Sequence, residues 1–369
     1  MQRWISGLDD AFYRGEKRLG WLFLSVLVGA GTYLLAMGYV SGEDFRPGPH
    51  GKIYMKLSAN PFDFSTPYEV GYRRLAPLLG YLLGLRGQSF LWLTALAAMA
   101  IPASIYGHLR SARHFTPSLA LGLALLIGLS SVLTIHFIAQ GYVDPVYYLL
   151  ILWAFLLADR SRWSLLFMAL APLAHECTLA LWPAWALLRL AAQRERGGSW
   201  LPSLLLSLLP LLPWLTWRMV ADQVLHMHAT FGLSYYFSQE NLQNMINQQL
   251  AFLPLGAFCA LKLGWLLPLQ GLRLYRQQQD WLRLAMSLLL LAGVAAQTLI
   301  ALDLGRLFSL AFPLAVVAAI DLHRHRSPHQ LTARVWWLVL LGLPLLTYYV
   351  AGSIVYPLMP WPIRALASP

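Results

Sequence analysis

The sequence predicts an all-α, polytopic membrane protein from its composition, its long apolar stretches and the positive charge at the ends of those stretches. Of 369 residues, 58% are hydrophobic and 12% are charged, and the mean hydropathy is +0.55. Soluble domains carry roughly 25% charged residues, so this composition excludes an ordinary soluble domain, a disordered chain and a coiled coil. The two cysteines, Cys177 and Cys259, lie singly in apolar stretches and form no disulfide or zinc motif.

About eleven apolar stretches approach the ~20 residues that cross a ~30 Å hydrocarbon core. In order, they are Leu19 to Val40, Leu91 to Tyr106, Pro117 to Ile135, Pro145 to Ala158, Ser164 to Ala174, Thr178 to Leu190, Leu201 to Val220, Ala251 to Leu269, Leu284 to Leu302, Leu307 to Ile320 and Val335 to Tyr356. A shorter stretch, Leu75 to Leu85, is interpreted as a re-entrant or interfacial helix. Since no repeat or soluble segment interrupts the pattern, we expect a single transmembrane domain, 1–369.

Positive charge orients these helices, because Lys and Arg near helix ends remain on the cytoplasmic side. If the short stretch does not cross, 17 of the 27 Lys and Arg residues lie inside and seven lie outside. The sequence therefore predicts a cytoplasmic N-terminus, an external C-terminus and two large outer loops, 41–74 and 221–250. The net charge of +11 then reflects membrane orientation, and no nucleic-acid partner is expected.

The first outer loop, 41–74, carries the first group of candidate functional residues. Glu43 and Asp44 follow the membrane exit, and Arg73 and Arg74 end the loop. Carboxylates can supply a base or a metal ligand, and arginines can clamp a phosphate. A divalent cation is the one cofactor that this loop could hold. The alternative is a solvated loop with ordinary charges.

Three further groups of ionisable residues fall at predicted membrane depth, where such residues are costly and mark functional sites by default. Asp144 precedes a stretch of only 14 residues, which reaches ~21 Å as a helix. His175 and Glu176 form the turn between two short stretches, and Asp303 and Arg306 begin another. The structural alternatives are a helix N-cap for Asp144, a capping acid for Glu176 and a simple i, i+3 pair for Asp303 and Arg306.

In this order, these residues resemble the integral-membrane glycosyltransferases of the GT-C type, in particular bacterial members that use polyprenyl-phosphate sugars. The first outer loop of such enzymes reads roughly Asp-Gly-x-x-Tyr, then Pro-Phe, then Arg-x-Leu-x-Pro-Leu-Leu. The corresponding stretches here are His50 to Tyr54, Asn60 to Phe62 and Arg73 to Leu79. The resemblance continues at Asp144, at Glu176-Cys177-Thr178, and at Asp303 and Arg306 followed by Pro313, so it covers most of the chain.

The resemblance implies transfer of a sugar from a polyprenyl-phosphate donor to a saccharide or lipid acceptor of the cell envelope. The protein would lie in the bacterial inner membrane, with its active site facing the periplasm or the exterior. His50 stands where the family usually has Asp, so Glu43, Asp44 and His50 all remain candidates for the general base. The residues expected to bind the donor phosphate are Lys52, Arg73, Arg74, His175 and Arg306, and those expected to shape the site are Tyr54, Asp144, Glu176 and Asp303.

Two other functions are compatible with the same residues. One is a transporter or flippase for a lipid-linked or anionic solute, with arginines and broken helices forming a binding site in the membrane. The other is a non-catalytic GT-C-like partner in envelope polysaccharide assembly, which the replacement of Asp by His50 would suit. The absence of an inverted repeat, and ionisable groups that all open to one side, favour the transferase.

Overall fold

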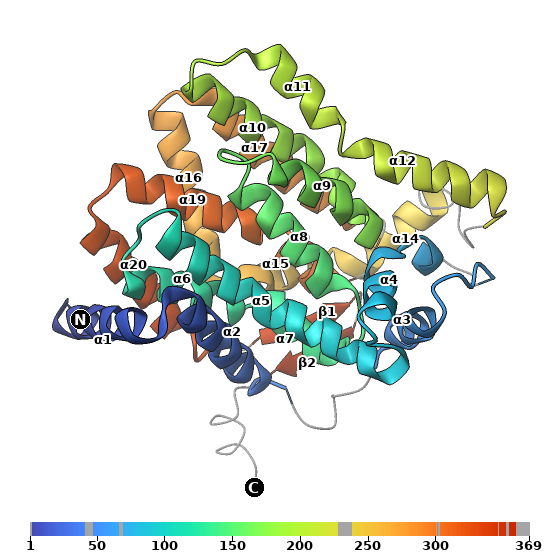
Figure 1. The fold of residues 1–369 in the computed structure, drawn as a ribbon, viewed down its shortest axis with the longest axis horizontal. Coiled ribbons are helices and arrows are strands. Elements are labelled where there is room, and N and C mark those ends of the chain that lie inside the picture. Colours follow the sequence, from blue (N-terminus) through green and yellow to red (C-terminus); the bar gives the residue numbers. More distant parts are fainter. Residues whose placement is uncertain are drawn as a thin grey trace, which may run out of the picture.

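The computed structural model describes residues 2–40, 47–65, 69–227, 238–299, 301, 303–345, 347–351 and 354–358, and they fold into packed helices with one short β-ribbon (Figure 1). The N-terminal elements are α1 (Gln2–Leu19), α2 (Trp21–Met37), α3 (Pro49–Ala59), η2 (Glu69–Tyr72), α4 (Leu75–Leu82), η3 (Gly87–Ser89), α5 (Phe90–Ser111), α6 (Pro117–Gly128), α7 (Ser131–Ile138), α8 (Asp144–Leu156) and α9 (Trp163–Ala174). The C-terminal elements are η4 (Glu176–Ala180), α10 (Trp182–Glu195), α11 (Trp200–Leu208), α12 (Leu211–Met219), η5 (Val220–Val224), α14 (Gln239–Gln249), α15 (Leu253–Leu261), η6 (Lys262–Trp265), α16 (Leu266–Gln277), α17 (Trp281–Gln297), α18 (Leu304–Ser309), α19 (Phe312–His325), α20 (Pro328–Gly342), β1 (Thr347–Ala351) and β2 (Ile354–Leu358).

Several of these helices are long and apolar enough to cross a membrane. Four continuous ones are Gly87–Ser111, Trp200–Val224, Leu253–Gln277 and Leu304–His325. A fifth candidate is the pair α6 and α7, which is bent by 43° at its break. Shorter apolar helices include α2, α8, α9 and α17. The chain thus has the helical, multi-pass character that its sequence predicts, while about eleven crossings and the sides of the two termini remain predictions.

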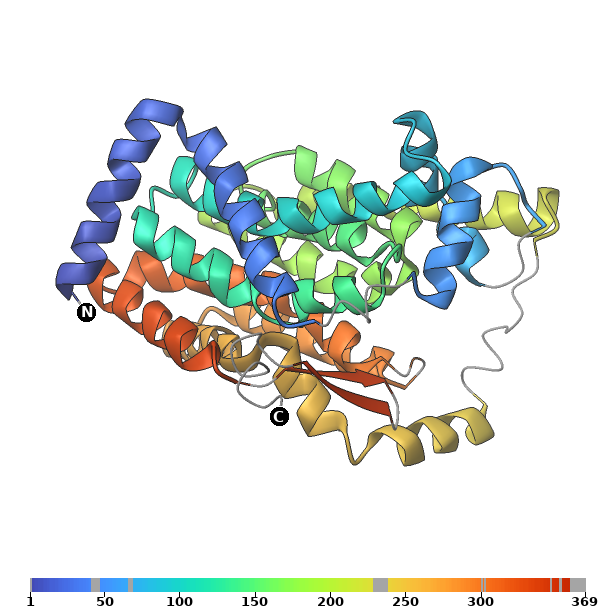
Figure 2. The same ribbon diagram turned by 90° about the horizontal axis from the view of Figure 1, so that it is seen from below.

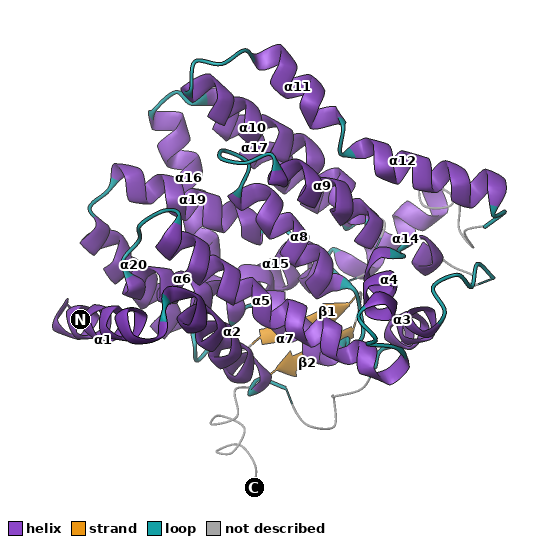
Figure 3. Ribbon diagram, in the orientation of Figure 1, coloured by secondary structure: helices purple, strands orange, loops and turns teal. Residues whose placement is uncertain are grey.

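The last predicted helix, Val335 to Tyr356, is the clearest difference from expectation (Figure 3). Helix α20 ends at Gly342, and the chain continues as strands β1 and β2, which pair antiparallel. Pro344 follows within the next turn and lacks the N–H that a continued helix requires. The segment beyond it is rich in Tyr, Val and Ile, residues that favour strands. High hydropathy alone does not distinguish such a ribbon from a helix.

The centre of the molecule is the helix formed by α18 and α19. In α19, every residue from Phe312 to Leu322 is buried, and the helix packs against α8 and α16. Around it, α5 packs against α2, α6 and α8, and α10 packs against α17. By contrast, the apolar helix Trp200–Val224 is only 17% buried within the protein. An apolar surface left so exposed is suited to lipid rather than to water.

Loops predicted to lie on opposite sides of the membrane gather at opposite ends of the fold. Helix α1 and the turn between α19 and α20 lie at one end, and α3 and α4 lie at the other, in both views (Figures 1 and 2). Helix α4 has eight residues, which span ~12 Å, and it packs on α3. It is therefore too short to cross by itself, as its interpretation as an interfacial or re-entrant helix requires.

Candidate functional site

Helix α3 is anchored to the connection between α7 and α8 by close backbone contacts. Pro47 forms an isolated parallel bridge with Gln140, and the Gly48 amide donates to the Gln140 carbonyl at 3.2 Å. A side chain at Gly51 would place its Cβ 2.1 Å from that carbonyl oxygen, and Gly141 on the opposite segment has φ +78°. Glycines at 51 and 141 thus allow the first outer loop to lie directly on this segment.

This docking brings His50 next to Tyr142 and Arg306. The rings of His50 and Tyr142 are stacked with centroids 5.5 Å apart, and the Arg306 guanidinium lies 5.4 Å from the centroid of the same tyrosine ring. The three side chains come from α3, from the α7–α8 connection and from α18. A candidate base and a candidate phosphate ligand therefore contact one aromatic ring.

Arg73 pairs with Glu176 across a long sequence separation. Its Nε donates to Glu176 Oε2 at 2.9 Å and to Oε1 at 3.2 Å, and its Nη1 donates to the Tyr54 hydroxyl at 3.3 Å. The Arg73 side chain is 13% exposed and that of Glu176 is 38% exposed, so the carboxylate is more open than the predicted buried acid. Burial lowers the pKa of Arg73, but the Glu176 carboxylate outweighs it and raises that pKa well above its usual value.

Tyr54 completes this group as a hydroxyl that keeps its proton. Burial raises the pKa of Tyr54 to about 12, although the Arg73 charge acts in the opposite direction. The hydroxyl is therefore protonated at neutral pH, accepts from Arg73 and retains a proton of its own to donate.

A second group of charges surrounds Arg306. Its Nε lies 3.5 Å from Asp144 Oδ1 and 3.6 Å from Asp303 Oδ2. The contact with Asp303 is the i, i+3 pair that the sequence left open as a structural alternative. The Asp303 carboxylate also accepts from the Arg306 amide as the N-cap of α18, a role that the sequence analysis did not assign to it. The Arg306 guanidinium, 14% exposed, donates no hydrogen bond to any other described residue. It therefore retains donors for an external anion.

His175 lies between the two groups. Its ring is buried and contacts Tyr147, with centroids 4.7 Å apart, and the Tyr147 hydroxyl donates to Asp144 at 3.2 Å. The charges of both ion-pair groups act on this ring. Nδ1 accepts a hydrogen bond from the Cys177 amide at 3.2 Å, so a neutral His175 carries its proton on Nε2. This ring connects the Arg73 group to the Arg306 group.

Not every candidate residue joins this site. The Arg74 guanidinium is buried and donates to the backbone carbonyls of Gly71, Pro61 and Asp63, so it ties the first outer loop together. Lys52 is exposed on α3. Glu43 and Asp44 lie outside the described residues. No cluster of three metal-ligating side chains occurs in the described part of the chain, so the divalent cation remains an untested prediction.

Two aromatic residues of the site, Tyr142 and Tyr147, were not predicted. Both lie beside Asp144 in the sequence YVDPVYY, and an aromatic residue there resembles the many others of a membrane chain. A cavity of about 440 Å³ adjoins the site and is lined by Gln140, His136 and Trp92. Another cavity, of about 660 Å³, lies elsewhere, at the α16, α19 and α20 end of the fold.

Comparison with family models, with curated proteins and with solved structures finds no match to this chain.

Proposed function

We propose that this protein is a GT-C-like membrane glycosyltransferase. It would move a sugar from a polyprenyl-phosphate donor to a saccharide or lipid acceptor of the cell envelope, at the extracytoplasmic face of the bacterial inner membrane. The observation that carries the proposal is Arg306, a guanidinium 14% exposed at the start of a helix long and apolar enough to cross a membrane, with its ion-pair distances to Asp144 and Asp303 at 3.5 and 3.6 Å. Such a group can bind a phosphate with paired N–H donors.

In this reaction, a base removes the proton of an acceptor hydroxyl as its oxygen attacks the anomeric carbon of the sugar. The bond between that carbon and the phosphate oxygen breaks, and polyprenyl phosphate leaves as the anion. Arg306 and Arg73 would stabilise the charge that develops on this phosphate. His50 is a candidate base, because it is half-buried and lies on the Tyr142 ring that Arg306 also contacts.

Glu176 and Asp144 would act by position rather than by contact with the sugar. Each pairs with one arginine, and the His175 ring lies between the two arginine groups. A donor phosphate that displaces a carboxylate from one arginine would still be flanked by neutral donors, the Tyr54 hydroxyl among them. This arrangement is suited to a phosphate monoanion or dianion rather than to a neutral solute.

The test uses full-length protein in lipid nanodiscs with radiolabelled polyprenyl-phosphate sugars and an envelope extract as acceptor. We expect labelled product, and we expect Arg306→Gln to lower the rate by about 100-fold or more, as for loss of one transition-state donor. Lys56→Gln is the matched control, since it removes one exposed charge from α3 and should leave the rate unchanged.

The base is identified by His50→Gln, Asp44→Asn and Glu43→Gln, of which one should abolish transfer while donor binding persists. If all three can be replaced together without loss, the proposed mechanism is wrong. Donor binding without any product in the wild-type protein would instead favour the transporter or the non-catalytic partner.

A further inference from the structure

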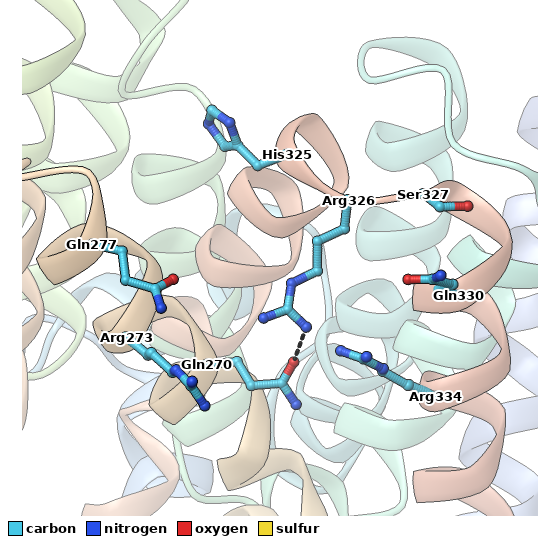
Figure 4. A pocket seen from close by; sticks show the side chains of 8 residues that line it. All are labelled: Gln270, Arg273, Gln277, His325, Arg326, Ser327, Gln330 and Arg334. Carbon is cyan, nitrogen blue, oxygen red and sulfur yellow. Dashed lines mark hydrogen bonds between the residues drawn. The ribbon is translucent and has the colours of Figure 1, made fainter.

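A basic cavity lies at the end of the fold opposite the candidate site. It measures about 660 Å³ and is lined by α16, α20 and the turn between α19 and α20. Arg273, Arg326 and Arg334 enter it from these three segments, and Figure 4 shows the guanidinium groups of Arg326 and Arg334 directed toward Gln270. No Asp or Glu is among its lining residues. The cavity therefore collects positive charge.

These three arginines differ from their neighbours, because none of them has an acidic partner among the described residues. At the same end of the fold, Arg113 pairs with Asp159 at 2.6 Å, and Arg324 pairs with Asp321 at 3.2 Å. In the part of the chain that the structure describes, neither Arg273, Arg326 nor Arg334 forms an ion pair. Arg326 donates only to the neutral Gln270 side chain, at 3.2 Å. Like charges held together without a counter-charge favour binding of an external anion.

The helix ends at the cavity add little net charge of their own. Ser327 is the N-cap of α20 and lines the cavity, so the positive end of that helix dipole begins there. The negative end of α19 also lies there, because that helix ends at His325. The arginines therefore supply the net positive charge, and Ser327 and neighbouring glutamines supply neutral donors.

Exposed apolar residues continue from the cavity along the same helix faces. On α16, Leu266 and Leu269 are 40% and 56% exposed and precede Gln270 and Arg273 by four positions. On α20, Trp337 and Leu341 are 53% and 55% exposed and follow Arg334 by three and seven positions. Residues at these spacings share one face of a helix. A basic cavity at the end of two apolar stripes matches a phospholipid, with its headgroup in the cavity and its acyl chains on the stripes.

We propose that this cavity is a binding site for the phosphodiester headgroup of an anionic phospholipid. Paired guanidinium donors match phosphate oxygens, and basic pockets between membrane helices bind such headgroups. Gln330 and Ser327 can donate to the hydroxyls of a glycerol headgroup. The site is separate from the proposed transferase site and does not depend on that function.

The test measures lipid binding to full-length protein by native mass spectrometry in detergent, with phosphatidylglycerol and phosphatidylcholine as probes. We expect the wild-type protein to retain phosphatidylglycerol preferentially. The triple variant Arg273→Gln, Arg326→Gln and Arg334→Gln should lose about tenfold or more in apparent affinity, because each basic residue contributes to attraction of anionic lipid. The matched control is Arg14→Gln, Arg194→Gln and Arg276→Gln, which removes three exposed arginines outside this cavity. It should change the affinity by less than about twofold.

The proposal is overturned if wild-type protein binds both lipids equally, or if the two triple variants lose phosphatidylglycerol to the same extent. Inorganic phosphate is the second probe, added as a competitor for the bound lipid. If phosphate alone displaces the lipid at millimolar concentration, the cavity binds a soluble anion and the lipid assignment is wrong. Should the Gln triple variant fail to fold, Arg334→Gln alone replaces it, since this exposed arginine forms no hydrogen bond within the described residues. That single variant should still weaken phosphatidylglycerol binding relative to Arg276→Gln.

Discussion

The ion pair between Arg73 and Glu176 joins the first outer loop to the connection between α9 and α10, and its strength can be predicted. Arg73 Nε lies 2.9 and 3.2 Å from the two Glu176 carboxylate oxygens, so the carboxylate lies along one edge of the guanidinium. Arg73→Gln, Glu176→Gln and the double variant complete a double-mutant cycle, which isolates the energy of the pair from the other effects of each substitution.

The expected coupling energy depends on how deeply the two side chains are buried. Breaking a buried ion pair costs about 3–5 kcal/mol, whereas exposed pairs contribute about 0.2–1 kcal/mol. Arg73 is 13% exposed but Glu176 is 38% exposed, so water screens one partner, and we expect a coupling energy of about 1–2 kcal/mol. Glu176→Gln should cost more than Arg73→Gln, because it leaves the nearly buried Arg73 cation without a counter-charge among the described residues. Its acceptors would then be neutral, a glutamine amide oxygen and the Tyr54 hydroxyl 3.3 Å away.

The assay is equilibrium unfolding in mixed micelles, followed by tryptophan fluorescence, for all four proteins of the cycle. A second cycle on Arg218 and Asp222 serves as the control, because this i, i+4 pair lies 3.4 Å apart with side chains 33% and 44% exposed. Its coupling energy should be about 0.3–0.5 kcal/mol. A coupling for Arg73 and Glu176 no larger than the control would refute the geometry of the site.

Three further predictions concern stability. Gly51→Ala should destabilise the protein by about 1–3 kcal/mol through overpacking, because its Cβ would lie 2.1 Å from a backbone oxygen. Gly31→Ala, with nothing within 4 Å of its Cβ, should be neutral or stabilising in the same thermal assay. Arg74→Gln should lower stability by about 1.5–3 kcal/mol, because its buried guanidinium serves three backbone carbonyls; unchanged stability would contradict this structural role. Burial raises the pKa of Glu16, but hydrogen bonds and charge from Arg110 outweigh it and lower the pKa below 4.5. Its stabilisation is therefore complete above pH 4.5 and is lost as the pH falls through the lowered value, so the melting temperature of Glu16→Gln should depend less on pH there than that of the wild-type protein.

The sequence predicts the local parts of the site well. The i, i+3 spacing of Asp303 and Arg306 predicts their proximity, and the structure places the two side chains 3.6 Å apart. The side of the membrane that the four candidate groups share is predicted from charge and helix length, and it stays a prediction. Pairing of Arg73 with Glu176 does not follow from the sequence, because it depends on how the first loop docks against helices that lie far along the chain. Tyr142 is missed for the same reason, since its importance arises only when His50 is placed on its ring.

The fold, like the site, can be predicted from the sequence only in its local features. Apolar length and Pro or Gly positions predict the starts of α6 and α8 at Pro117 and Asp144 closely. The 43° bend between α6 and α7 lies at Ser130, whose side chain caps α7 by accepting from the Val132 amide. Hydropathy is insensitive to that capping, just as it is insensitive to the change from helix to strand after Gly342.

The extracytoplasmic location of the candidate site depends on the predicted orientation of the chain in the membrane. Labelling of single cysteines tests that orientation. Gln243 is exposed on α14 and Gln278 is exposed between α16 and α17, and the charge distribution predicts them to be outside and inside, respectively. With Cys177 and Cys259 replaced by alanine, Gln243→Cys should react with an impermeant maleimide in intact cells, and Gln278→Cys should react only after permeabilisation. The reverse pattern would place the Arg73 and Arg306 groups on the cytoplasmic side, where an extracytoplasmic sugar donor could not reach them. Labelling of both residues from outside would mean that the number of crossings between them is even rather than odd, and the helix Leu253–Gln277 would then not cross.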